Sequence, residues 1–454
     1  MTAPAGGGEP TGWLQTTSLA AGVVLGLALL ITGLVAGRAD IAVLGAPALL
    51  SAAWAWTARP RGGAVRATFV PAEAGGTGPG ELRARLRLDV PDGAAPVRLR
   101  VTSPGNDDAD VTVLVDGTRT LDLTTHSART GPHRTFRVDH VAAGVEGGFE
   151  SRPDDVQAPG SLVLPTAQPL GRLPWPHQLV GLTGPHTTRR HGDGTELRDV
   201  HPFAPGDRLR RIDWRATARR SPGLETLYVR RTQATAEATV VLVLDSRDEV
   251  GPDVTTWRGN GPLPMDRATS LDVARNAAAS VAQAALDGGD RVGFEDLGWV
   301  RRPLPPAAGK RQLRRIVHAL ALAHPVGDPG RRMRPPQIPA GALVYMFSTF
   351  LDDESASIAQ TWRGTGHPVV AVDILPTVEV PRGDPGVALA WRITHIEREQ
   401  RLESLRREGI LVVRWLPPIG GDDPGTPGRS ARSARTALEL TARQQRHAQQ
   451  GTSR

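Results

Sequence analysis

The sequence predicts a mixed α/β protein, in which an α/β domain with a mostly parallel sheet follows a two-helix transmembrane hairpin and a small all-β, sandwich-like module. Three observations lead to this prediction. Two long apolar runs lie near the N-terminus, short stretches of period-two hydrophobicity occupy residues 64–170, and apolar strand-like runs alternate with helical patterns in residues 236–416. Strands that alternate with helices favour a parallel sheet with right-handed crossovers.

Composition restricts the chemistry that the 454-residue chain can perform. The sequence contains no cysteine, which excludes disulfides, thiol nucleophiles and cysteine metal sites. The formal net charge is +7, and the basicity comes from arginine because Lys310 is the single lysine. The arginines alternate with acids and form neither a basic helix nor a patch with interleaved aromatic residues, so we predict no nucleic-acid partner.

Residues 17–58 are predicted to form the transmembrane hairpin, after a small and polar N-terminus, residues 1–16, that we expect to be disordered. Ser18–Gly37 is an uncharged run of about twenty residues, long enough for a helix to cross a hydrocarbon core of roughly 30 Å. Ile41–Ala58 is a second apolar run, and a short polar turn joins the two. A buried hairpin in a soluble protein is the alternative. A cleaved signal peptide is disfavoured because no basic region precedes the first run.

The flanks of the hairpin predict its orientation. Trp54 and Trp56 lie where an interfacial aromatic belt is expected, and Arg59, Arg61 and Arg66 follow the second run. Arginines in short flanking segments favour the cytoplasmic side. We therefore predict a multi-pass protein of the cell membrane with two helices, whose soluble part lies in the cytoplasm.

Residues 64–170 are predicted to form the all-β module. Apolar residues alternate with arginine and aspartate from Leu82 to Val90, as in a strand with one solvated face. Asp116-Gly117 is a hairpin-turn signal that leads into a further strand, Arg119–Leu123. Several short strands separated by turn signals favour a small sandwich. The other strand candidates are Val97–Val101, Val111–Val115, Phe136 with Val138, and Leu162 with Leu164.

Residues 236–416 carry the α/β pattern. Thr239–Asp245 is an apolar run that ends in an acid, which is typical of a buried central strand. Ligands on parallel sheets bind at the carboxyl ends of the strands, which here indicates Asp245 and Ser348. The tail, residues 417–454, is predicted to be disordered, with Ala431–His447 as a candidate surface helix. The further strands expected are Arg291–Phe294, Ala342–Phe347, Val369–Asp373 and Ile410–Trp415, and the helices are Ser270–Leu286, Lys310–Leu322, Asp353–Arg363 and Glu397–Arg407.

A connecting segment, residues 171–235, contains a dense pattern of arginines and acids. Within it, Pro205-Gly206 predicts a tight turn, and Ile212 and Trp214 alternate with charges as in a half-buried strand. One hypothesis is that these residues form a cluster of salt bridges, a structural knot, which fixes the β module to the α/β domain, with the Trp214 side chain packed beneath the salt bridges. The alternative is an exposed docking surface for a partner. The pattern consists of Arg198, Gly206, Asp207, Arg211, Asp213, Trp214, Thr217 and Arg219.

The stretch P-G-D-x-x-R-R-I-D-W-R-x-T-A-R, with Arg198 upstream, resembles the signature of the bacterial domain of unknown function 58 family. The resemblance implies a membrane-anchored protein with an α/β domain similar to the von Willebrand factor A fold, which is Rossmann-like. It also implies a MoxR-type AAA+ ATPase as partner, and a role in assembling or activating a protein complex. It implies no biochemical activity.

Domains of the von Willebrand factor A type often hold a divalent cation after the first strand, through a D-x-S-x-S pattern with a threonine and an aspartate from later loops. In this chain the pattern is degenerate, because Arg247 and Glu249 replace the two serines after Asp245. Ser348 and Thr349 follow a later strand at the same edge of the sheet. A guanidinium repels a cation and pairs with a neighbouring acid, so we expect no divalent cation and no cofactor.

The sequence lacks a P-loop, a G-x-S-x-G elbow and an H-E-x-x-H zinc motif. The leading hypothesis is therefore a non-enzymatic, membrane-anchored interaction module that works with the AAA+ ATPase and presents one end of its sheet to other proteins. The alternative is a metal-dependent adhesion or ligand-binding protein that faces the cell exterior. A third hypothesis is a hydrolase whose acids the sequence alone does not pair.

Overall fold

The computed structural model divides the chain into two compact units. The first comprises Met1–Ala128 and Pro132–Val163, and the second comprises Arg129–Gly131 and Leu164–Arg454. The residues that the structure describes are 13–60, 63, 65–71, 81–103, 107–144, 147–171, 173–174, 179, 184, 186–223, 225–259, 263, 265–298, 303–326, 334–381, 383–416 and 434–443.

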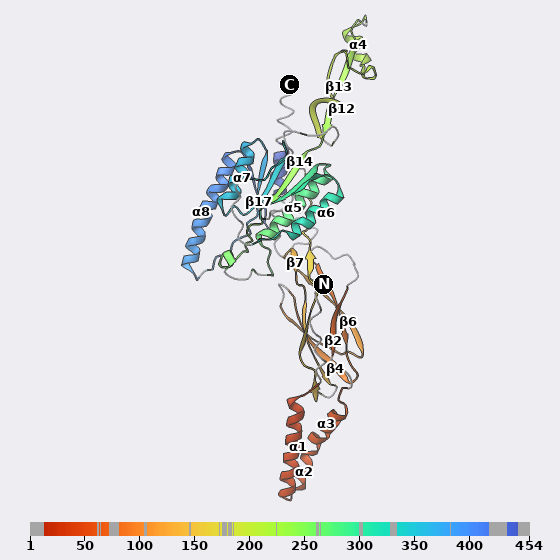
Figure 1. Cartoon of the computed structure of the whole chain (residues 1–454), viewed down its shortest axis with the longest axis vertical. Helices are drawn as coiled ribbons and strands as arrows, with labels where there is room; N and C mark the ends of the chain where they lie inside the picture. The colour runs from red at the N-terminus through yellow and green to blue at the C-terminus, as the bar shows by residue number, and fades with distance from the viewer. Residues whose placement is uncertain are drawn as a thin grey trace. The chain divides into compact units, whose positions relative to one another are not determined.

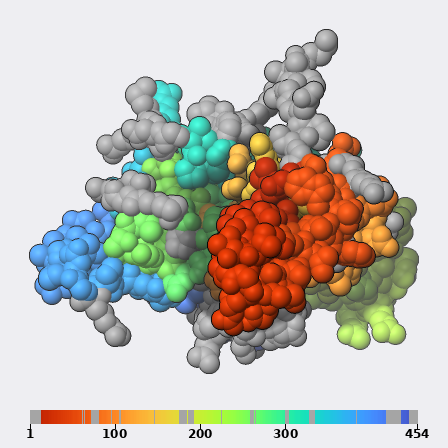
Figure 2. Space-filling model, turned by 90° about the horizontal axis from the view of Figure 1, so that it is seen from below, coloured from red at the N-terminus to blue at the C-terminus, as the bar shows by residue number. Residues whose placement is uncertain are grey.

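The N-terminal hairpin consists of α1 (Thr17–Val35), α2 (Ala39–Leu44) and α3 (Ala46–Thr57) (Figure 1). Thr17–Val35 and Ala39–Thr57 are each long and apolar enough to cross a membrane, judged by length and composition. The helices approach closely because glycine lies at their contact: a Cβ atom on Gly33 would come within 2.4 Å of the backbone nitrogen of Ala42. In the space-filling view the helices form one compact block, drawn in red (Figure 2).

The β module contains two sheets that share one buried cluster. Leu86 and Leu88 from one sheet meet Val97, Leu99 and Val138 from the other, which is the packing of a sandwich. The first sheet is formed by β2 (Arg66–Val70), β3 (Glu81–Asp89) and β6 (Thr118–His126). The second is formed by β1 (Leu14–Gln15), β9 (Phe149–Glu150), β8 (Arg137–Gly144), β4 (Ala94–Thr102) and β5 (Ala109–Val113), with β10 (Asp154–Gln157) paired to β8. β7 (Gly131–His133) pairs with β11 (Ser161–Val163).

Two expectations about this module are wrong. Asp116-Gly117 does not close a hairpin, because β5 pairs with β4 whereas β6 pairs with β3 in the other sheet. Period-two alternation identifies a strand but not its partner. The N-terminal segment is also structured from residue 13 onward, since Trp13 is buried in the module core and Leu14 pairs with Glu150. Residues 1–12 of the predicted disordered segment lie outside the described residues.

A six-stranded sheet in the order β16-β15-β14-β17-β18-β19 forms the centre of the second unit. The strands β15, β14, β17, β18 and β19 are parallel, and β16 is an antiparallel edge strand. Their bounds are β14 (Thr239–Leu244), β15 (Arg291–Asp296), β16 (Leu304–Ala307), β17 (Leu343–Ser348), β18 (Val369–Asp373) and β19 (Leu411–Arg414). The predicted mixed α/β fold with a mostly parallel sheet is therefore present.

Helices cover both faces of this sheet (Figure 1). Leu242 and Leu244 of β14 pack in one cluster with α5 (Ser270–Asp287) and α6 (Lys310–Leu322). Val241 and Val243 pack in the other cluster with α7 (Asp353–Gly364) and α8 (Pro385–Arg407). Successive strand side chains point to opposite faces, so a strand covered on both faces is a nearly continuous apolar run. A 3-10 helix, η2 (Val254–Gly259), precedes α5.

Two elements of this unit depart from the sequence-based prediction. Strand β16 is absent from the sequence-based prediction. It contains Pro305-Pro306, and proline cannot donate a backbone hydrogen bond to a neighbouring strand, but an edge strand tolerates it. Helix α8 begins at Pro385, twelve residues before the predicted start at Glu397. The side chain of Asp384 accepts hydrogen bonds from the amides of Gly386 and Val387, and proline at the first helical position completes this start signal.

The C-terminal tail contains a helix at residues 434–443. Its Ala434 and Leu438 are buried in the same cluster as α5 and α6. The predicted surface helix is therefore a core helix, because its apolar residues recur at helical spacing and one stripe of them is covered. Residues 417–433 and 444–454 of the predicted disordered tail lie outside the described residues.

An antiparallel ribbon precedes the central strand of the sheet. β12 (His186–Pro202) pairs with β13 (Tyr228–Ala236), and the segment between them holds η1 (Leu209–Arg211) and α4 (Trp214–Arg220) (Figure 1). We call residues 186–236 the signature arm. Residues 191–194, with the sequence HGDG, form an irregularity within β12, where the register with β13 shifts.

Candidate functional site

Polar side chains gather at the carboxyl edge of the parallel sheet. Asp245 directly follows β14, and Ser348 ends the neighbouring strand β17. Asp373 ends β18 in register with Ser348, and Asp296 ends β15 in register with Leu244. Parallel strands with the same register bring their last residues to one edge, where ligands of such sheets bind.

Asp245 is buried, and its carboxylate is paired with Arg247 in a bidentate ion pair. The Arg247 Nε lies 2.8 Å from Oδ1, and Nη2 lies 2.9 Å from Oδ2. The Ser348 hydroxyl donates a third hydrogen bond of 2.8 Å to Oδ2. This fork-to-carboxylate geometry is the strongest that an arginine offers. The structure thus brings Asp245, Arg247 and Ser348 together.

Arg247 is compensated on its outer side by two further acids, Asp352 and Glu354. Its Nη1 lies 3.0 Å from Asp352 and 2.9 Å from Glu354, both at the start of α7. Burial lowers the pKa of Arg247, but the hydrogen bond and charge of Asp245, with the charge of Asp352, raise it above its ordinary value overall. A permanent positive charge therefore lies against the carboxylate that a cation would need.

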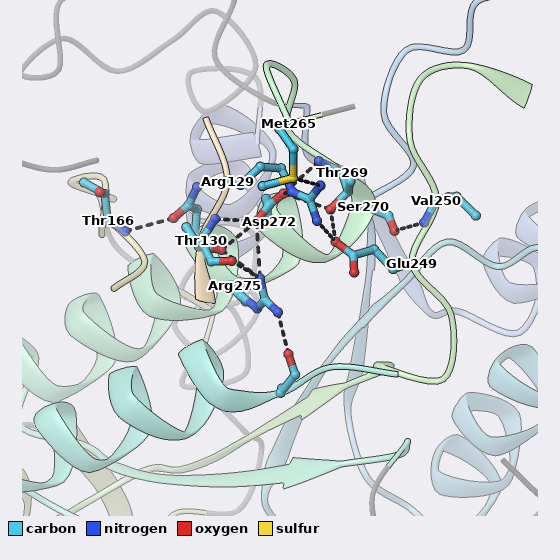
Figure 3. Close-up of polar contacts among 12 residues, drawn as sticks. Arg129, Thr130, Thr166, Glu249, Val250, Met265, Thr269, Ser270, Asp272 and Arg275 are labelled. Carbon is cyan, nitrogen blue, oxygen red and sulfur yellow. Dashed lines mark hydrogen bonds and ion pairs between the residues drawn. The ribbon is translucent and has the colours of Figure 1, made fainter. Parts of the chain in front are cut away.

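Glu249 does not point to Asp245 but belongs to a second buried network (Figure 3). Its Oε1 accepts hydrogen bonds from Arg129 (2.5 Å) and from Thr269 (2.6 Å). Asp272, in the first turn of α5, accepts hydrogen bonds from the amide and hydroxyl of Thr130 at 2.7 Å each.

Asp272 is also held by two arginines. Arg129 Nε lies 2.7 Å away, and Arg275 Nη1 lies 3.2 Å away. Two arginines therefore face two acids, Asp272 and Glu249, and each buried charge has an opposite partner (Figure 3). Removing one member of such a buried set leaves an uncompensated charge. No local pattern could have assigned Arg129, which is more than a hundred residues away from its partners in sequence.

Thr349 also lies apart from Asp245. Its hydroxyl is 3.5 Å from Asp248, and its carbonyl accepts a hydrogen bond of 2.8 Å from Arg398 Nε. Arg398, on α8, also pairs with Asp373. The next residue, Phe350, is fully buried and has a left-handed backbone with a φ of 54°, a conformation that costs free energy for a residue with a Cβ atom.

Of the five residues of the degenerate cation pattern, the structure therefore joins three around one carboxylate and turns Glu249 and Thr349 elsewhere. Among the residues that the structure describes, no three histidine, aspartate or glutamate side chains are arranged to hold a metal ion. The only local signal for Asp352 and Glu354 is the acidic start of a predicted helix, because Asp352 caps α7.

Four acids of the signature arm, Asp193, Asp199, Asp207 and Asp213, are bound within the arm itself. Asp207 accepts a hydrogen bond from the amide of Ala204 at 3.0 Å and lies 3.3 Å from Arg231. The amide of Ala204 and then the charge of Arg231 lower the pKa of Asp207. Arg211 pairs with Asp193. Gly206 adopts a φ of 101°, which confirms the predicted tight turn.

Asp213 begins helix α4 rather than continuing a strand. Its side chain accepts a hydrogen bond of 3.0 Å from the amide of Ala216, as an N-cap residue does. Thr217 is buried and its hydroxyl accepts a hydrogen bond of 2.9 Å from the amide of Tyr228, which holds α4 on β13. The strand predicted at Ile212 and Trp214 is therefore wrong, because the Asp213 cap redirects the chain.

Trp214 is 63% exposed, and the expectation that it packs beneath a knot is wrong. Among the residues that the structure describes, the side-chain hydrogen bonds and ion pairs observed for residues 193–232 are made inside the arm. The arm charges hold the arm together. Arg198 lies 3.6 Å from Asp199, and Arg219 is exposed on α4.

Comparison with known proteins supports the family resemblance for part of the chain. The sequence model of the family described as "Protein of unknown function DUF58" matches residues 199–387. No curated protein matches the chain. Two structures of a β-glucuronidase from Ruminococcus gnavus, with D-glucuronic acid and with D-glucaro 1,5-lactone, align at 11% and 10% identity, covering 85% of this chain and 59% and 60% of theirs. Their TM-scores are 0.14, so this likeness carries no argument.

Replacement of Arg247 by alanine should destabilise the sheet edge, because Asp245 would remain buried without a counter-charge, at a cost of about 3–5 kcal/mol. Hydrogen exchange of the β14 and β17 amides in the full-length protein in detergent measures this. Arg314→Ala, which changes an exposed arginine on α6, is the control and should change the free energy of unfolding by less than about 0.5 kcal/mol.

Calorimetry should detect no magnesium or manganese binding to the wild type, because Arg247 occupies both oxygens of Asp245. Micromolar binding that Asp245→Ala abolishes would contradict this expectation.

Asp248→Asn should flatten the pH dependence of stability. Burial, and then the charges of Asp245 and Asp352, raise the pKa of Asp248 to about 7. The folded protein then holds a proton that the unfolded chain, with an aspartate pKa of about 3.9, has released. The free energy of unfolding therefore falls as the pH rises from about 4 to about 7. The midpoint temperature, measured at pH 5 and pH 8, should fall less for Asp248→Asn than for the wild type; equal changes contradict the assignment.

Asp213→Ala should loosen α4 without unfolding the protein. Loss of an N-cap hydrogen bond lowers the free energy of unfolding by about 0.5–2 kcal/mol. Breaking a buried ion pair would lower it by more, about 3–5 kcal/mol. Faster hydrogen exchange confined to residues 214–220 is the expected result, with Asp213→Asn as the conservative control. A large drop in the melting temperature of the whole protein would restore the hypothesis of a structural knot.

Proposed function

We propose that this protein is a non-enzymatic, membrane-anchored interaction module that docks a partner protein through its signature arm. The observation that carries the proposal is the exposure of Trp214 within a segment in which Asp193, Asp207 and Asp213 are bound internally. Tryptophan and arginine are the residues that most often dominate binding at protein interfaces. Two N-terminal helices long and apolar enough to span a membrane supply the anchor.

The proposed partner is a MoxR-type AAA+ ATPase, and the proposed role is the assembly or activation of a protein complex. This step rests on the resemblance of the signature to its family, which the match over residues 199–387 supports. The α/β domain is proposed to be of the von Willebrand factor A type, because a parallel sheet carries Asp245 and Ser348 at the carboxyl edge of two neighbouring strands.

The proposed orientation places the soluble part in the cytoplasm, where an ATPase partner would be. Arg59, which follows the second apolar helix, favours this side. The proposed absence of a cation rests on Arg247, whose guanidinium takes both oxygens of Asp245. A metal-dependent adhesion protein would need that carboxylate free, so this alternative has no support at the sheet edge.

The test is affinity purification of the tagged, full-length protein from its own host in mild detergent, with and without ATP, followed by mass spectrometry. We expect a MoxR-type ATPase to be enriched in an ATP-dependent manner. Trp214→Ala should reduce the recovery at least about tenfold, because loss of a central interface tryptophan costs about 2 kcal/mol or more.

Leu389→Ala, which removes an exposed apolar side chain from α8, is the matched control and should leave the recovery unchanged. Recovery of envelope or extracellular proteins in place of an ATPase would contradict the proposal. Labelling of the soluble part from outside intact cells would contradict the proposed orientation independently of the partner.

A further inference from the structure

The signature arm carries an excess of positive charge. Nine arginines and five acids lie in residues 196–231, which leaves a net charge of +4. The arginines are Arg198, Arg208, Arg210, Arg211, Arg215, Arg219, Arg220, Arg230 and Arg231, and the acids are Glu196, Asp199, Asp207, Asp213 and Glu225.

The acids in the centre of the arm are occupied by internal contacts. Asp207 binds Arg231, and Asp213 caps α4 and lies 3.9 Å from Arg230. Asp193, on β12, binds both Arg208 and Arg211. The acids thus fix the backbone of the tip and neutralise the arginines next to the ribbon.

Three arginines at the tip are exposed and, among the described residues, face no acid within ion-pair distance: Arg210, Arg215 and Arg219. Arg215 and Arg219 are four residues apart on α4, so their side chains lie one above the other on one face of the helix. Arg220 is held differently, with its guanidinium 5.3 Å from the centre of the Tyr228 ring.

An apolar surface adjoins these arginines. Trp214 is 63% exposed and Leu209, in η1, is 68% exposed. Trp214 and Ala218 share a face of α4 next to that of Arg215 and Arg219. Large apolar side chains that are exposed beside cations form the combination found at the centre and rim of protein interfaces.

We propose that the tip of the arm binds an acidic protein surface, with Trp214 inserted into an apolar recess and Arg215 and Arg219 paired with carboxylates around it. This inference rests on the proposed docking function and specifies the chemistry of the docked surface. Charge complementarity assigns the acidic partner. A protein is favoured over an anionic membrane because the tip is fixed by internal salt bridges, and fixed guanidinium forks suit carboxylates held at fixed positions.

The first test is site-specific photo-cross-linking in the host, with a photoreactive phenylalanine derivative in place of Trp214 in the full-length protein. Position 389 on α8 serves as the background control. The inference expects cross-linked partner peptides at position 214 that are rich in aspartate and glutamate. Basic or neutral peptides, lipid adducts, or no adduct above the position 389 background would each overturn it.

The second test reverses charge at the tip. Arg215→Glu together with Arg219→Glu should lower the yield of the position 214 cross-link at least about tenfold. Arg311→Glu with Arg314→Glu makes the same change of four charge units on exposed positions of α6 and should leave the yield unchanged. Circular dichroism and hydrogen exchange of residues 214–220 check that the tip variant retains its helix. An unchanged yield in the tip variant would overturn the inference.

The outcomes separate the two proposals. An acidic cross-linked surface on a protein that is not an ATPase supports the inference and contradicts the proposed partner. An ATPase cross-linked through a basic or neutral surface, or insensitive to the charge reversal, supports the proposed function and contradicts the inference.

Discussion

The burial of strand β14 on both faces is the constraint on which the second unit depends. Its side chains enter two separate apolar clusters, one with α5 and α6 and one with α7 and α8. A strand covered on both sides disfavours polar groups, because a polar atom there loses its hydrogen bonds to water. Val240–Leu244 is apolar throughout, and the first polar residue after it, Asp245, lies where the strand leaves the sheet. The location of the candidate site follows from the packing.

Arginine compensates the acids at that edge. Arg247 binds Asp245, Arg398 binds Asp373, and Arg129 and Arg275 hold Asp272. A guanidinium keeps its charge over the whole physiological pH range, and as part of the chain it cannot dissociate as a metal ion can. Asp245, Asp373 and Asp272 therefore each have a counter-charge within the chain, whereas Arg215 and Arg219 of the arm are exposed.

The signature arm divides its charged residues between two roles. Asp207 and Asp213 stabilise the arm itself. Asp207 accepts a hydrogen bond from the amide of Ala204 and pairs with Arg231, and Asp213 caps α4. Trp214, Arg215 and Arg219 face solvent. A structural knot and a docking surface are thus not exclusive hypotheses: the acids give the tip a defined shape, and the shape presents an aromatic side chain and cations. The structure departs from the knot hypothesis in leaving Trp214 exposed.

The pattern of the sequence by itself determined β14, β17, β18, α5, α6 and α7, because each buries its own stripe or run of apolar residues. The length of two apolar runs determined the hairpin helices, whose apolar side chains are largely exposed. The sequence pattern also identified Asp245, Arg247 and Ser348, since strand ends of a parallel sheet share one edge. Only the tertiary structure decided features that depend on distant partners: the sheet to which β6 belongs, the edge position that lets β16 contain two prolines, the burial of the helix at residues 434–443, and the pairing of Arg129 with Asp272 and Glu249. The exposure of Trp214 is of the same kind, because a hydrophobicity pattern states that a side chain is apolar but not whether the fold supplies anything to cover it.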